Sequence, residues 1–143
     1  MKTYNLYLDD VRNPVDSYGY TGNQYYLNSD WDVVRTYDEF INRLEGGLRE
    51  EEFPAIISFD HDLADEHYDP SMYKGANAYE KAAKNFVEKT GLECANWLVQ
   101  FCIDNDMSMP ICLIHSMNPA GSERIKQSIA DYDRYMKAID RNR

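Results

Sequence analysis

The sequence predicts an α/β domain with a largely parallel sheet. Four short apolar segments of strand type alternate with segments whose apolar residues recur at helical spacing. Most of the strand-type segments are apolar throughout instead of alternating with polar residues. Strands that helices cover on both faces have this composition, and alternating strands and helices are typical of parallel sheets.

The four strand-type segments are residues 5–9, 31–36, 56–59 and 110–115. Aromatic and β-branched side chains are frequent in them, which favours strands over other structures. In an open parallel sheet, side chains at the carboxyl ends of the strands face the ligand crevice. Polar residues that follow these segments are therefore candidates for a site.

Two helices are predicted between the strands. Apolar residues follow helical spacing over 40–48, behind a Thr-x-x-Glu capping box that begins at Thr36. The same pattern recurs over 92–103, behind a second such box at Thr90.

A third, longer helix is predicted at the C-terminus. Asn118 is a natural N-cap, and Pro119 suits the first helical position. One apolar stripe then runs along the helix, formed by Ile125, Ile129, Tyr132, Met136 and Ile139.

Two segments interrupt this alternation. Residues 15–30 are rich in Tyr, Gly and Asn, and predict a long loop or a small hairpin. Residues 64–89 form an apparent insertion, with a short helix predicted over 78–89.

Length and composition are those of an ordinary globular protein. The 143 residues, 43% hydrophobic and 28% charged, predict a single domain over 1–143. No apolar stretch reaches the roughly 20 residues of a membrane span, and the N-terminus lacks the apolar region of a signal peptide. Three cysteines without CxxC spacing indicate neither a disulfide framework nor a zinc site. A cytoplasmic location and no membrane partner are therefore expected.

The net charge of −10 argues against an extended nucleic-acid-binding surface. A small anionic substrate could still bind if a cation bridged it to a group of carboxylates. The sequence makes no statement about oligomeric state.

Acidic residues gather at the ends of the first and third strands. Asp9 and Asp10 end the first, and Asp60 and Asp62 flank His61 after the third. If the strand order resembles that of flavodoxin-type sheets, the two strands are neighbours and the four carboxylates converge. Such carboxylates repel one another unless protons or a cation intervene, and Mg²⁺ or Mn²⁺ is the usual cation. In an extended chain His61 points away from Asp60 and Asp62, so the three are not expected to share one ion.

The fourth strand leads directly into the C-terminal helix. Free N–H groups and the helix dipole at such a start favour an anion, and His115 suits acid–base chemistry near neutral pH. Ser116 and Asn118 add polar side chains, and Gly121 permits close approach. Arg12 could contact a phosphate or neutralise the aspartates. Each feature also has a structural interpretation: turn chemistry at Asp9-Asp10, a satisfied histidine at 115, a helix cap at 118.

Four blocks of the chain together resemble a known family. They are LYLDDVRNP (6–14), ISFDHDL (57–63), TGLECANWL (90–98) and HSMNPAG (115–121). In this order they are similar to the motifs of cyclic-phosphate-processing receiver-like domains, small bacterial and phage proteins related to response-regulator receivers. The resemblance implies a three-layer α/β/α sandwich with a mostly parallel, flavodoxin- or receiver-like sheet. It also implies one pocket lined by Asp9, Asp10, Asp60, Asp62 and the loop His115-Ser116-Asn118. The insertion at 64–89 departs from the family pattern.

The function expected from these observations is that of a metal-dependent phosphoesterase. Its substrate would be a small cyclic phosphate, either a cyclic nucleotide or an RNA 2′,3′-cyclic end. Asp9, Asp10, Asp60 and Asp62 are the expected ligands of Mg²⁺ or Mn²⁺. The expected catalytic residues are His115, His61 and Asp60, and the expected phosphate-binding residues are Ser116, Asn118, Gly121 and Arg12.

Two other functions use the same residues. A signalling receiver would be phosphorylated on Asp60, but no fifth strand ending in Lys is visible after His115. The same objection applies to a haloacid-dehalogenase-type phosphatase, whose Asp-x-Asp signature FDHDL resembles. A non-catalytic module would bind a cyclic nucleotide or a protein partner, and its pocket would share most residues with that of an enzyme.

Overall fold

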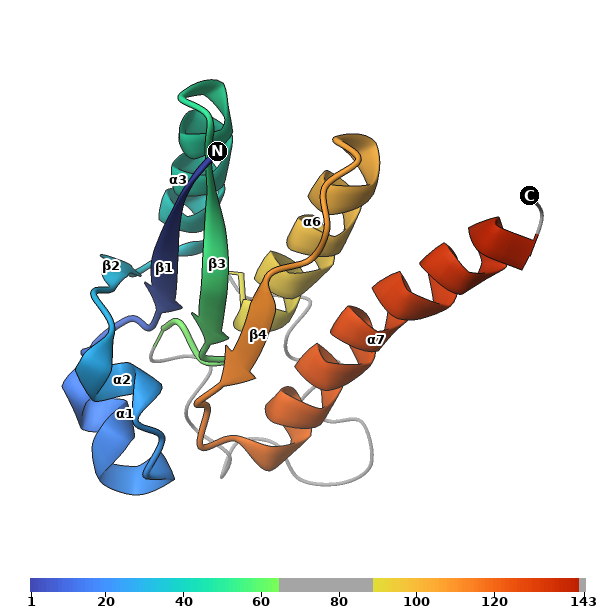
Figure 1. Ribbon diagram of the computed structural model, residues 1–143. Helices are drawn as coiled ribbons and strands as arrows, with labels where there is room; N and C mark the ends of the chain where they lie inside the picture. Colours follow the sequence, from blue (N-terminus) through green and yellow to red (C-terminus); the bar gives the residue numbers. More distant parts are fainter. Residues whose placement is uncertain (65–88, 142–143) are drawn as a thin grey trace.

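The sheet has four parallel strands in the order β2-β1-β3-β4 (Figure 1). The structure is a computed structural model and describes residues 1–64 and 89–141. The strands are β1 (Lys2–Leu8), β2 (Asp32–Val34), β3 (Glu52–Phe59) and β4 (Ile111–Ile114). The predicted α/β class and parallel sheet are confirmed, and β1 and β3 are neighbours as in flavodoxin-type sheets.

All three predicted helices are present: α3 (Tyr37–Arg49), α6 (Gly91–Asp104) and α7 (Pro119–Arg141). Their caps are those that the sequence predicts. The Thr36 hydroxyl accepts a hydrogen bond from the Glu39 N–H at 3.1 Å, and Thr90 begins a capping box. Asn118 Oδ1 accepts from the N–H of Gly121 at 3.0 Å and so caps α7.

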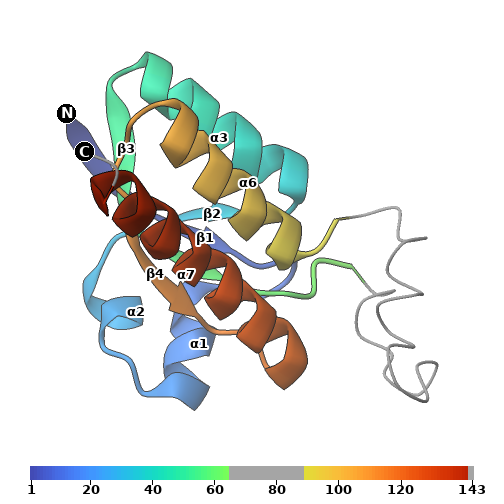
Figure 2. The ribbon, with the colours of Figure 1, turned by 90° about the vertical axis from the view of Figure 1, so that its right-hand side faces the viewer.

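The main core lies between the sheet and the three long helices. Figure 2 shows α3 and α6 side by side on one face of the sheet, and α7 packs against α6 beside β4. Fully buried side chains from the sheet and from these helices meet there: Leu6, Leu8, Ile57 and Phe59 from the sheet, and Phe40, Leu98 and Ile125 from the helices. Their burial supplies the hydrophobic stabilisation that holds the strand ends in register.

The loop or hairpin predicted for residues 15–30 is wrong, because two helices lie there. They are α1 (Pro14–Thr21) and α2 (Tyr25–Asn28). Asn13 and Asp16 form a capping box around Pro14, and Gly22 ends α1 in the left-handed conformation with φ 69°. These local end signals outweigh the Tyr- and Gly-rich composition on which the loop prediction rested.

Helices α1 and α2 lie on the other side of the sheet from α3 and α6, near the carboxyl ends of the strands (Figure 2). Tyr7 points to this second face, where its hydroxyl bonds to Ser17 of α1 at 2.6 Å and its ring meets Tyr26 of α2. The three layers that the family resemblance implies are therefore present.

The segment predicted as an insertion, 64–89, lies outside the described residues except for Ala64 and Lys89, and so does almost all of the helix predicted there. Among the helices that the structure describes, none has the length and apolar character to cross a membrane.

Candidate functional site

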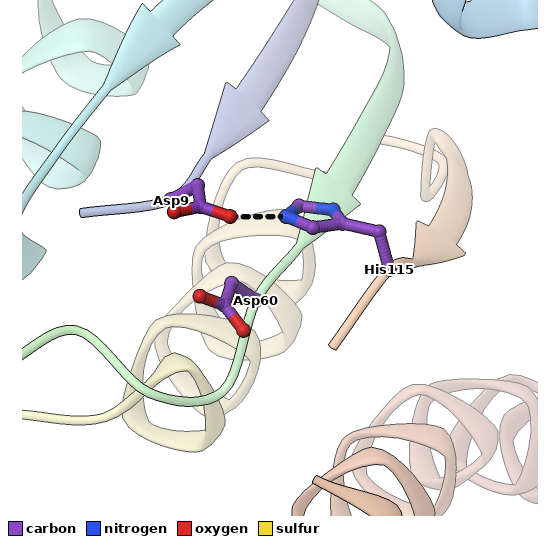
Figure 3. A group of neighbouring side chains, drawn as sticks. All are labelled: Asp9, Asp60 and His115. Atoms are coloured by element: carbon purple, nitrogen blue, oxygen red, sulfur yellow. Dashed lines mark hydrogen bonds and ion pairs between the residues drawn. The ribbon is translucent and has the colours of Figure 1, made fainter. Parts of the chain in front are cut away.

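Three side chains meet where β1, β3 and β4 end. Asp9, Asp60 and His115 each follow the last residue of a strand, and those last residues are paired in register. One ligand atom from each lies within 4.8 Å of the others (Figure 3). All three residues are buried, with at most 1% of their surface exposed. The predicted convergence of acidic residues from the first and third strands is therefore present for Asp9 and Asp60.

Hydrogen bonds hold both oxygens of the Asp9 carboxylate. Oδ1 accepts from the N–H groups of Val11 at 2.9 Å and Arg12 at 2.8 Å, and Oδ2 accepts from His115 Nε2 at 3.1 Å. Burial by itself would raise the pKa of Asp9, but these hydrogen bonds outweigh it and the pKa falls below its usual value. Asp9 is therefore an ionised carboxylate with a fixed orientation.

Asp60 has the opposite electrostatic character. Burial, followed by the negative charges of Asp9, Asp62 and Asp10, raises the pKa of Asp60 from 3.8 to about 8, although Arg12 acts in the other direction. Without a cation the Asp60 carboxyl thus holds a proton at neutral pH. A divalent cation beside Asp9 and Asp60 would favour the ionised form of Asp60 and so oppose this shift of its pKa, and oxygen ligands suit Mg²⁺ and Mn²⁺. The donor set fits such an ion.

His115 is surrounded on all sides by protein. Its Nε2 bonds to Asp9, its Nδ1 lies 2.7 Å from the Ser58 hydroxyl, and its ring stacks on Tyr7 at 4.3 Å. Burial lowers the pKa of His115 despite the hydrogen bond to Asp9. Because both ring nitrogens are engaged, the geometry favours a role in supporting Asp9 over direct proton exchange with a substrate.

His61 and Asp62 form a second pair beside the first turn of α7. His61 Nδ1 lies 2.9 Å from Asp62 Oδ1, to which the Asn118 amide also donates at 3.3 Å. The alternation expected for an extended chain at 60–62 does not hold, because β3 ends at Phe59 and the chain turns. His61 therefore faces Asp62 instead of pointing away from it.

Gly121 lies against the imidazole of His61. A Cβ atom there would lie 2.3 Å from Cγ of His61, so the glycine makes room for this imidazole. Its N–H donates to Asn118 Oδ1, and the N–H of Asn118 donates to Ser116 Oγ at 3.1 Å. Several of the polar groups that were expected to bind an anion are thus engaged in hydrogen bonds that close the turn into α7.

Arg12 brings a positive charge next to these carboxylates. Its guanidinium lies 3.9 Å from Asp9 Oδ2, next to Met117 and over the Tyr20 ring, and its side chain is 27% exposed. Asp10 is partly exposed, and its charge adds to those that raise the pKa of Asp60.

Sequence reasoning missed the polar residues that surround His115, chiefly Tyr7, Tyr26 and Ser58. Ser58 is the clearest missed signal, because it is a hydroxyl residue within the apolar run that ends β3, two positions before Asp60. Residues two apart on a strand share a face, so a buried polar residue there indicates a partner near the strand end.

The fold and the site agree with the comparison of the chain with protein families. The family model for the cyclic-phosphate processing Receiver domain matches residues 4–131, which include most of β1, the other three strands and the first half of α7. No curated protein and no solved structure gave a significant match. The chain belongs to the family of cyclic-phosphate processing receiver domains.

Proposed function

We propose that this domain is a metal-dependent phosphoesterase that opens a small cyclic phosphate. The observation that carries the proposal is the meeting of Asp9, Asp60 and His115 at three strand ends, buried and within 4.8 Å. Two carboxylates at this separation are costly to bury unless a cation or a proton accompanies them. The family match supports the choice of a cyclic phosphate as the substrate.

The carboxylates of Asp9 and Asp60 would hold Mg²⁺ or Mn²⁺, with Asp10 at the edge of the centre. When bound, the ion would offset the charge that develops on the phosphate oxygens. Asp9 contributes a carboxylate that is already ionised and oriented by hydrogen bonds. Asp60 contributes its carboxylate after losing its proton, so ion binding and deprotonation are coupled.

The substrate would be a cyclic nucleotide or an RNA 2′,3′-cyclic end that approaches past Arg12. The guanidinium at the exposed edge would bind a non-bridging phosphate oxygen. Water would add its oxygen to phosphorus and give up a proton, one P–O ester bond of the ring would break, and the released oxygen would take up one proton. His61 would carry this proton transfer, because it lies in the loop that follows Asp60 and Asp62 orients its Nδ1.

One observation favours a second candidate, a non-catalytic module that binds a cyclic nucleotide. The polar groups that precede α7 form hydrogen bonds within the protein, at His115, Ser116 and Asn118. Such bonds favour a rigid binding pocket. A receiver phosphorylated on Asp60 is less well supported, since the sheet of the described residues has four strands and a receiver of that type uses a Lys at the end of a fifth.

The test begins with thermal unfolding in the presence and absence of Mn²⁺. We expect Mn²⁺ to raise the melting temperature of the wild type and of Asp104→Asn, a change at an exposed carboxylate on α6, but not of Asp60→Asn. No rise in the wild type would refute the metal centre. With the ion established, 2′,3′- and 3′,5′-cyclic nucleotides are assayed for hydrolysis by ³¹P NMR. Binding without turnover would replace the phosphoesterase by the binding module, and turnover that His61→Ala abolishes with binding intact would support the enzyme.

A further inference from the structure

Four buried polar side chains form one unbroken line of hydrogen bonds. The Tyr26 hydroxyl lies 2.6 Å from the Ser58 hydroxyl, which lies 2.7 Å from His115 Nδ1. On the far side of the imidazole, Nε2 lies 3.1 Å from Asp9 Oδ2. The line connects helix α2, β3, the end of β4 and the end of β1, so it crosses the second face of the sheet to reach the candidate metal centre.

The carboxylate at one end sets the direction of every bond in this line. The ionised carboxylate of Asp9 can only accept, so Nε2 of His115 carries the hydrogen. Nδ1 of the neutral imidazole is then an acceptor, and the Ser58 hydroxyl donates to it. Because Ser58 has used its hydrogen, it accepts from the hydroxyl of Tyr26. A single tautomer of His115 therefore satisfies all three bonds.

The surroundings of the imidazole leave this arrangement little freedom. The Tyr7 ring stacks on His115 at 4.3 Å and 7°, and the Tyr26 ring meets its edge at 6.1 Å. The Tyr20 hydroxyl donates to the backbone carbonyl of His115 at 2.5 Å. Ser58 has 0% of its surface exposed, so water does not replace a lost partner at Nδ1 without repacking.

We propose that Ser58 and Tyr26 are positioning residues, which orient the Asp9 carboxylate by holding the His115 imidazole where its Nε2 reaches Asp9. This inference rests on the proposed metal centre for its functional consequence. If the Ser58 hydroxyl is removed, Nδ1 loses its hydrogen-bond donor, and the imidazole is held less firmly at the angle at which Nε2 meets Asp9 Oδ2. The carboxylate is then held less firmly in the orientation in which it meets the ion.

The first measurement is the Mn²⁺ dissociation constant, determined by electron paramagnetic resonance. Ser58→Ala should raise it by about tenfold to a hundredfold, as losses of such supporting partners do, and Tyr26→Phe should raise it less. Ser17→Ala is the matched control, because Ser17 is equally buried and bonds to a tyrosine hydroxyl of the same cluster at 2.6 Å. Ser58→Thr keeps the hydroxyl and should restore binding. An equal rise of the Mn²⁺ dissociation constant in Ser58→Ala and in Ser17→Ala would overturn the proposal.

The second measurement needs no metal and no substrate. In ¹⁵N NMR of the metal-free protein, the imidazole whose signals vanish in His115→Gln should carry hydrogen on Nε2 alone. In Ser58→Ala the hydrogen should stay on Nε2, and the Nδ1 signal should move toward that of a ring nitrogen that accepts no hydrogen bond; an unchanged Nδ1 signal would overturn the proposal. Hydrogen on Nδ1 in the wild type would overturn the proposal. A wild type that binds no Mn²⁺ but has hydrogen on Nε2 alone would refute the proposed function while supporting the tautomer assignment.

Discussion

Replacement of Asp60 by Asn should remove a pH dependence of stability that the wild type shows. Asp60 is 1% exposed, and burial together with nearby carboxylates raises its pKa from 3.8 to about 8. The folded protein therefore keeps a proton on Asp60 up to about pH 8, whereas the unfolded chain keeps it only below about pH 4. The stability that this proton contributes is fully present below the unfolded pKa and is lost as the pH rises through the folded one.

The size of the effect follows from these two pKa values. Between about pH 4 and about pH 8, each pH unit lowers the free energy of unfolding by about 1.4 kcal/mol. The total loss over this range is at most about 6 kcal/mol, and it is smaller if the surroundings of the carboxylate relax. Asn has nearly the same volume and carries no charge. At pH 8 in metal-free buffer, Asp60→Asn should therefore be more stable than the wild type by several kcal/mol.

Urea unfolding in EDTA, from about pH 5 to about pH 8, measures the free energy of unfolding of both proteins. The difference in favour of Asp60→Asn should grow by about 1.4 kcal/mol per pH unit. The control Asp104→Asn should run parallel to the wild type. If Asp60→Asn also ran parallel, Asp60 would be ionised in the folded protein throughout, and the reasoning from burial and repulsion would be refuted.

Three further substitutions test the packing, a cap and the phosphate contact. Gly91→Ala would place a Cβ 1.8 Å from the backbone oxygen of Asp60, so it should lower the free energy of unfolding in urea by more than about 3 kcal/mol. The control Gly46→Ala should be tolerated, because the Cβ there would meet only a side-chain atom at 3.7 Å. Thr36→Ala should cost about 1 kcal/mol by the same assay, because it removes the N-cap of α3, and an unchanged stability would show that the cap is dispensable. Arg12→Gln should raise the KM for a cyclic phosphate by about tenfold while Mn²⁺ still raises the melting temperature; an unchanged KM would remove Arg12 from the phosphate site.

Local signals were sufficient for most of the fold. The strands, the three long helices and their caps depend on side-chain periodicity and on hydrogen bonds between residues three or four apart, such as Thr36 and Glu39. The meeting of acidic side chains at the strand ends could also be predicted, because a parallel sheet brings Asp9 and Asp60 to the same edge once β1 and β3 are neighbours. Helix α1 could have been predicted in the same way, from Asn13 and Asp16 around Pro14.

The details of the site depend on contacts that no local pattern encodes. His115 is separated by 57 residues from Ser58 and by 106 from Asp9, and the spacing of apolar residues does not say which partners its two ring nitrogens meet. Likewise, only the packing of α7 brings Gly121 against His61. The sequence by itself determined the strands, the caps and the acidic edge, since each follows from near neighbours. The tertiary structure alone decided which polar groups are paired and buried, and hence that Asp60 keeps a proton that Asp9 has lost.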